Sequence, residues 1–96
     1  MIVEHASINV LPGEEQRFEQ ALAEAREVIA GAPGYRGLRA LRGVESPHSY
    51  LLLIEWDTLE DHMVGFRESE LFGRWRALIG PHFDGAPSVD HYRPLD

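Results

Sequence analysis

Histidine is the candidate group for proton transfer in this chain, which has five histidines and no cysteine. Histidine titrates near neutral pH and therefore serves well as a general base. His62 is the best-placed of the five, because its neighbour Met63 belongs to the apolar stripe of a predicted short helix. His62 then lies at the edge of that stripe; the alternative is a histidine that faces solvent. The absence of cysteine excludes disulfides, thiolate nucleophiles and cysteine-based metal sites, and it fits a reducing compartment.

Further side chains have the types expected in the wall of a ligand pocket. Trp75 lies in the apolar stripe of the last predicted helix, so it either packs in the core or stacks on an aromatic ligand. Phe66 allows the same two interpretations. His82 follows a Gly-Pro turn that can direct its side chain into a pocket, or it serves structure alone. The predicted strands contain Arg39, Tyr50 and Tyr35. Each of these side chains either forms a hydrogen bond to a ligand or has a structural role alone.

A metal site is not expected. His5 and His91 fall on the first and last predicted strands, which are antiparallel neighbours in the expected topology, so we predict that they approach each other. A metal needs a third ligand, and the alternation of side chains along a strand places Glu4 and Asp90 on the opposite face. The sequence also lacks a Gly-x-Ser-x-Gly nucleophile turn, a His-Glu-x-x-His helix and a glycine-rich phosphate loop.

Length and charge narrow the classes of partner. The chain has 96 residues, which suits one domain over residues 1–96. Nine basic against 16 acidic residues give a net charge of −7, which disfavours nucleic acid and anionic membranes as partners. The longest apolar run, Leu51 to Ile54, is too short to cross a membrane, and no leader pattern is recognisable. We therefore expect a cytoplasmic protein.

Hydrophobic periodicity predicts the elements that must position these residues. Four strands are expected, at Ile2 to Leu11, Tyr35 to Val44, Ser49 to Trp56 and Ser88 to Arg93. A long helix is predicted over Glu14 to Ala30, with an inner stripe of Phe18, Leu22, Ala25 and Ile29. The second helical region is broken in two. Its first part opens with the capping-box pattern of Thr58 to Asp61 and has a predicted inner stripe of Leu59, Met63 and Phe66. Its second part follows Ser69 as the cap and ends at Gly80.

The order β-α-β-β-α-β predicts a ferredoxin-like α+β fold with a four-stranded antiparallel sheet. Helices cover one face of such a sheet. Leu51 and Leu53 point to the other face of the central strand, which needs cover from a second copy. We therefore expect a homodimer in which two sheets pack face to face as a dimeric α+β barrel.

Three stretches of the sequence resemble the antibiotic-biosynthesis monooxygenase (ABM) family. The first is Ala32-Pro33-Gly34-Tyr35-Arg36-Gly37, like the family's Pro-Gly turn into its second strand. The second is Tyr50-Leu51-Leu52-Leu53-Ile54-Glu55-Trp56, like its third strand. The third is Leu59-Glu60-Asp61-His62, followed by Phe66, Ser69 and Phe72. In order and spacing the resemblance covers nearly the whole chain.

The resemblance implies a dimeric α+β barrel and a cofactor-independent monooxygenase with molecular oxygen as co-substrate. The substrate would be a small aromatic molecule of the anthrone, phenol or quinol type. His62 would then act as the base, with Phe66, Trp75, His82, Arg39 and Tyr50 lining the pocket. A haem-degrading branch of the family uses an asparagine, a tryptophan and a histidine, but the corresponding positions here are Ala6, Phe66 and Arg76, and none matches.

Two other functions remain open on the same fold. One is a non-catalytic dimer that binds or senses a small ligand, and the other is a structural partner domain. A deep apolar pocket with an inward histidine favours an enzyme or a binder, whereas a pocket filled by Trp75 and the phenylalanines favours the structural role.

Overall fold

The computed structural model describes all 96 residues and has eight elements of secondary structure. They are β1 (Ile2–Asn9), α1 (Glu15–Ile29), β2 (Tyr35–Arg42), β3 (Ser49–Trp56), η1 (Asp61–Phe66), α2 (Glu70–Ile79), η2 (Gly80–His82) and β4 (Ser88–Tyr92). The strands form one antiparallel sheet in the order β2-β3-β1-β4. This is the predicted ferredoxin-like α+β fold.

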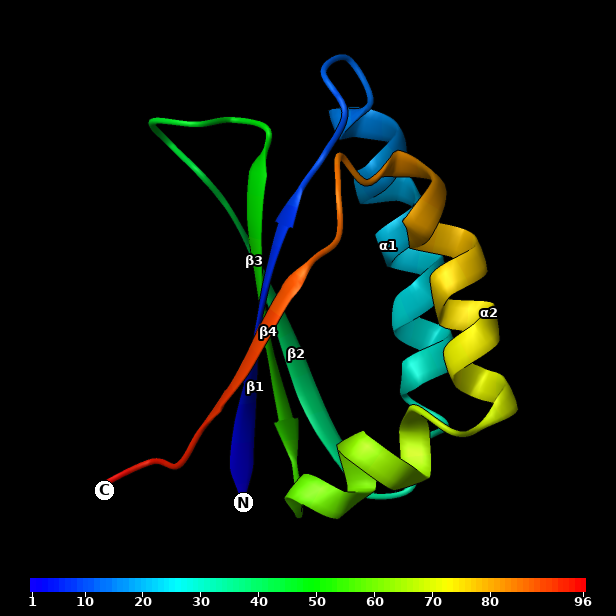
Figure 1. Ribbon diagram of the computed structural model, residues 1–96, viewed down its shortest axis with the longest axis vertical. Helices are drawn as coiled ribbons and strands as arrows, with labels where there is room; N and C mark the ends of the chain where they lie inside the picture. The colour runs from blue at the N-terminus through cyan, green and yellow to red at the C-terminus, as the bar shows by residue number, and fades with distance from the viewer.

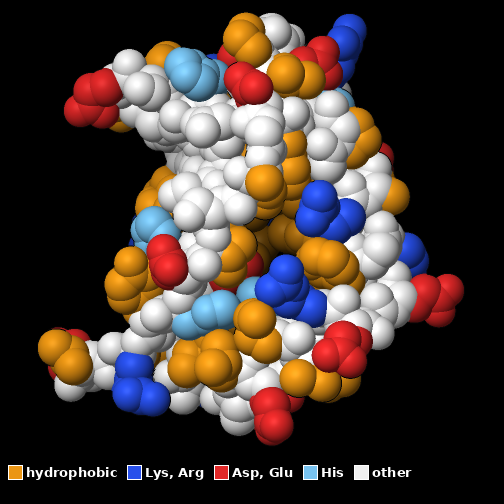
Figure 2. Space-filling view, in the orientation of Figure 1, with side chains coloured by type: hydrophobic (Ala, Val, Ile, Leu, Met, Phe, Trp, Pro, Cys, Tyr) orange, Lys and Arg blue, Asp and Glu red, His pale blue; other side chains and the backbone are white.

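The molecule has two layers (Figure 1). Helices α1 and α2 pack side by side on one face of the sheet, and the other face carries no helix. Leu51 and Leu53 of β3 lie half-buried on that second face. Between the layers the front of the molecule is hollowed (Figure 2). No helix has the length and apolar character needed to cross a membrane.

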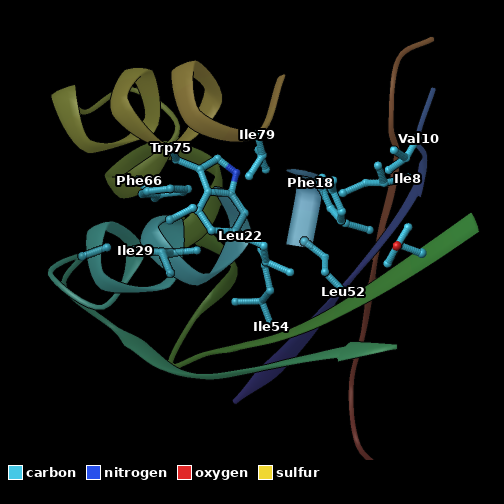
Figure 3. Packing of buried hydrophobic residues seen from close by; sticks show 14 of the residues in the cluster. Ile8, Val10, Phe18, Leu22, Ile29, Leu52, Ile54, Phe66, Trp75 and Ile79 are labelled. Atoms are coloured by element: carbon cyan, nitrogen blue, oxygen red, sulfur yellow. The ribbon is translucent and has the colours of Figure 1, made fainter. Parts of the chain in front are cut away.

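The core lies between the helices and the sheet (Figure 3). The predicted stripe of α1 is confirmed, because Phe18, Leu22, Ala25 and Ile29 are all buried. They face Leu52 and Ile54 of β3, while Trp75 and Ile79 of α2 close the far side. The predicted first strand contributes Ala6 and Ile8, which point into this core.

The segment after β3 differs from its prediction. Thr58 Oγ1 accepts a hydrogen bond from the Asp61 backbone N–H at 3.1 Å, as a helix cap should, but η1 is a π-helix with i→i+5 bonds. The wider turn directs His62 and Phe66 inward. Leu59 and Met63, predicted to face the core, are 48% and 37% exposed. The predicted stripe is therefore confirmed for Phe66 and wrong for Leu59 and Met63, because it assumed an α-helical period.

Ser69 occupies the predicted cap position before α2 without capping the helix through its side chain. Its hydroxyl instead donates to the Phe66 carbonyl at 2.7 Å. This bond closes the turn between η1 and α2. It fixes the end of the π-helix against the helix that forms the far wall of the hollow.

Candidate functional site

A cavity of about 250 Å³ lies between α2 and the β1–β4 side of the sheet. Its wall is mostly apolar, with Leu52, Trp75, Ile79 and Phe83 among the lining residues. The polar residues that line it are Glu4, His62, Arg67 and Arg76. An apolar, partly aromatic hollow with a few polar groups is the usual form of a small-molecule site.

Glu4 is the unusual residue of this cavity. The alternation of β1 places it on the inward face beside Ala6, and the residue is only 6% exposed. Its Oε1 accepts a hydrogen bond from the Trp56 indole N–H at 3.0 Å. Its Oε2 makes no hydrogen bond within the chain and is not sealed from solvent. Because Glu4 lines the cavity, Oε2 is the oxygen available to a ligand there.

His62 connects Glu4 to the last strand. Its Nε2 lies 3.2 Å from Glu4 Oε1, and its Nδ1 lies 2.8 Å from Nε2 of His91, so each ring nitrogen faces a polar neighbour. The imidazole stacks on Trp56 with ring centroids 5.2 Å apart and is 4% exposed. The three groups thus form a continuous line, which we call the Glu4–His62–His91 array.

Burial controls the ionisation of the array. It raises the pKa of Glu4 to about 7, against the opposing effects of the Trp56 hydrogen bond and the Arg67 charge. Burial also lowers the pKa of His62 to about 4, and the charges of His91 and Arg67 act in the same direction. The pKa of His91 is lowered too, mainly by burial, with Asp90 opposing. A carboxyl group that titrates near neutrality beside a neutral imidazole is suited to accepting and returning protons.

The predicted pairing of His5 with His91 is wrong. The register pairs His91 with Glu4 and His5 with Asp90, so the two histidines lie on opposite faces of the sheet. Glu4 was predicted to lie on the other face of the sheet from His91. The register pairs the two residues, so they lie on the same face. No group of three side chains is arranged to hold a metal ion. In the array, His62 directs one nitrogen to each neighbour, so its members do not converge on a single point.

Among the predicted site residues, the structure brings His62 and Trp75 together in the cavity wall. Phe66 is buried behind them, with its ring centroid 6.2 Å from Trp75 and 6.4 Å from His62, so it supports the wall without lining it. The role of His62 as a base stays a prediction.

Three other predicted pocket residues lie away from this cavity. Arg39 pairs with Leu53 in the register, so it points to the helix-free face. Tyr50 is buried on the inner face, where its hydroxyl donates to Glu19 at 2.6 Å. Burial, and next the Glu19 bond, raise the pKa of Tyr50 to about 12, so the hydroxyl stays a donor. His82 contacts Glu14 at 3.0 Å near the start of α1.

Sequence reasoning missed the partners of His62. A glutamate among the inward residues of β1 was the available signal, because a buried carboxylate needs a partner. The sequence has no such signal for His91, because the face of the sheet on which a residue of a five-residue strand lies depends on the register of that strand.

Comparison with known proteins identifies relatives along the whole chain. The sequence model of the antibiotic biosynthesis monooxygenase family matches residues 1–78. The chain is 40% identical to YczJ of Bacillus subtilis, an uncharacterised protein, over 99% of this chain and 100% of YczJ.

Solved structures of similar fold agree. A candidate antibiotic biosynthesis monooxygenase from Bordetella bronchiseptica is 41% identical, with a TM-score of 0.96 over 98% of this chain and 96% of that one. A mutant of SnoaB, a cofactor-independent oxygenase from Streptomyces nogalater, has a TM-score of 0.83 over 99% of this chain and 93% of that one. Its 15% identity makes it a match of fold alone.

Proposed function

The chain belongs to the antibiotic biosynthesis monooxygenase family, and from that premise we propose that it is a cofactor-independent monooxygenase acting on a small aromatic substrate of the anthrone, phenol or quinol type. The observation that carries the proposal is the buried Glu4–His62–His91 array in the wall of an apolar cavity. Oxygenation without a metal or flavin requires an apolar slot for the ring and a group that removes a proton, so that the substrate anion can pass an electron to oxygen.

The Glu4–His62 pair is the proposed base, and Glu4 is its contact with the substrate. Each nitrogen of His62 faces a neighbour within the array, so a proton from the cavity enters at the free Oε2 of Glu4 and resides on this carboxyl, whose pKa lies above that of His62. The pKa of Glu4, raised by burial to about 7, suits a group that takes up and returns protons near neutral pH. Trp75 contributes an aromatic wall against which a flat substrate can stack.

For a hydroxyarene the reaction runs as follows. The hydroxyl proton passes to the array, and the resulting anion donates one electron to dioxygen, which gives superoxide and a ring radical. These combine at a ring carbon, and the peroxide takes a proton from the array. That carbon then loses its hydrogen as a proton to the array, and the C–H electron pair forms a carbonyl as the O–O bond breaks. The distal oxygen leaves as hydroxide and takes this last proton from the array to become water, so hydroxyarene and dioxygen give quinone and water.

Oxygen uptake tests the proposal. Purified, metal-free protein is assayed with a panel of anthrones, naphthols and reduced quinones, and uptake is expected to scale with protein concentration. His62→Gln and Glu4→Gln should each reduce turnover at least about 100-fold, because general acid–base catalysis contributes at least that much. His48→Gln is the matched control, since His48 is exposed in a loop away from the cavity.

Two results would count against the proposal. Uptake no faster than the protein-free rate across the panel would contradict oxygenase activity. Uptake that is unchanged in both array variants would remove the array from the mechanism. Saturable binding of panel compounds without any oxygen consumption would support the second candidate, a ligand-binding dimer that uses the same cavity.

A further inference from the structure

Arg67 and Arg76 both line the cavity, and neither has an acidic partner. The protein has 16 acidic residues against nine basic ones, so unpaired arginines are not a consequence of scarce carboxylates. The arginines that form ion pairs, Arg17, Arg36 and Arg42, lie away from the cavity. Other arginines of the chain also lack an ion pair, but Arg67 and Arg76 are the two that line the cavity.

Aromatic side chains hold the two guanidinium groups at the cavity. Arg67 lies 6.0 Å and Arg76 lies 5.9 Å from the centroid of the Phe72 ring, and Arg76 also lies 5.7 Å from the Phe83 ring. Phe72 and Phe83 are lining residues themselves. The only hydrogen bond of Arg67 is a weak one, to the Met63 sulfur at 3.7 Å. In Figure 2 basic side chains flank the hollow on two sides. Because no ion pair and only this weak bond engage Arg67 and Arg76, most of their N–H donors stay free for a ligand.

The rest of the cavity offers these charges no compensation. Burial favours the uncharged forms of Glu4 and His62, and the charge of Arg67 reaches the array, since it lowers the pKa of Glu4, His62 and His91. Below neutral pH the cavity therefore has two positive charges and aromatic walls, and its interior has no carboxylate to balance them. The complement of such a site is an aromatic anion.

We propose that Arg67 and Arg76 form an anion-binding subsite, and that the substrate is a small hydroxyaromatic acid whose carboxylate lies between these arginines while its hydroxyl meets Glu4. Arginine suits this task because its planar fork binds carboxylates through paired hydrogen bonds. The assignment of a substrate rests on the proposed function, whereas the anion subsite can be tested by binding alone.

The test compares 2-naphthoate with 2-naphthamide, its neutral analogue of nearly the same shape. Neither compound has a hydroxyl group, so oxidation cannot interfere. Binding is followed by the quenching of tryptophan fluorescence, to which Trp75 in the cavity wall contributes. The acid should bind the unaltered protein more tightly than the amide. Arg67→Gln and Arg76→Gln should each weaken binding of the acid about tenfold, the usual effect of one charge-assisted hydrogen bond, and leave binding of the amide unchanged.

Arg74→Gln is the matched control, because Arg74 is exposed on the same helix and does not line this cavity. It should leave both affinities unchanged, and circular dichroism establishes that all variants are folded. Equal affinity for acid and amide, no binding of the acid, or unchanged acid binding in both arginine variants would overturn the anion subsite. Arginine-dependent binding of hydroxynaphthoates without oxygen consumption would instead retain the subsite and refute the oxygenase.

Discussion

Two single variants of the Glu4–His62 pair should show opposite pH dependence of the free energy of unfolding. Burial raises the pKa of Glu4 from 4.5 to about 7 and lowers the pKa of His62 from 6.5 to about 4. Between pH 4.5 and 6.5 the unfolded chain has a glutamate anion and a histidine cation, which bind one proton in total. The folded pair also holds one proton, so the unaltered protein should show little pH dependence from these two groups.

Each single variant removes this compensation. In His62→Gln, Glu4 alone remains; its raised pKa stabilises the fold below pH 4.5, and the contribution is lost as pH rises to about 7. In Glu4→Gln, His62 alone remains; its lowered pKa destabilises the fold at low pH, and stability rises between about pH 4 and 6.5. Each interval spans about 2.5 pH units, which at about 1.4 kcal/mol per unit corresponds to about 3–4 kcal/mol.

Urea unfolding followed by tryptophan fluorescence measures this effect. Protein concentration is held fixed, because unfolding of a dimer depends on concentration. Other titrating groups, Asp90 and His91 included, are present in every form, so the difference from the unaltered protein isolates the missing group. His48→Gln should run parallel to the unaltered protein. Curves that also run parallel for both array variants would refute the reasoning.

Other perturbations have defined outcomes. Trp56→Phe removes the indole donor to Glu4, so the pKa of Glu4 should rise above about 7, measured as a shift of its carboxyl titration in carbon-detected NMR. Gly34→Ala should reduce the free energy of unfolding in urea by about 1–3 kcal/mol, because φ is +84° and the new Cβ meets the Asp61 side chain. Binding of 2-naphthoate should weaken as pH rises through about 7, where Glu4 ionises in the cavity, and should not weaken in Glu4→Gln. The protein should scatter light as a dimer of about twice 10.9 kDa, and Leu53→Arg should make it a monomer.

The sequence was sufficient to predict the elements that have strong periodicity. The bounds predicted for β3, Ser49 to Trp56, are those observed, because apolar residues on both of its faces leave little choice. The inner stripe of α1 was correct because its apolar residues recur at the helical period on one face. The chain order of these elements fixed the ferredoxin-like topology, since antiparallel neighbours with short connections admit few alternatives.

The site was less predictable because it depends on small departures from regular geometry. The π-helical turn moved His62 from the edge of a stripe into the core, and no local signal distinguishes such a turn from an α-helix. The register of β4 placed His91 beside Glu4 instead of His5, since a shift by one residue exchanges the two faces of a strand. Arg39 was misplaced because alternation along β2 directs it to the helix-free face.

The most direct test of the central claim is the fate of the oxygen atoms. A substrate from the uptake panel is incubated with metal-free protein under ¹⁸O₂, quenched promptly and examined by mass spectrometry. We expect one labelled oxygen atom in the product, and much less product with Glu4→Gln and His62→Gln. A product whose new oxygen is unlabelled, or one that forms equally without the protein, would contradict the account.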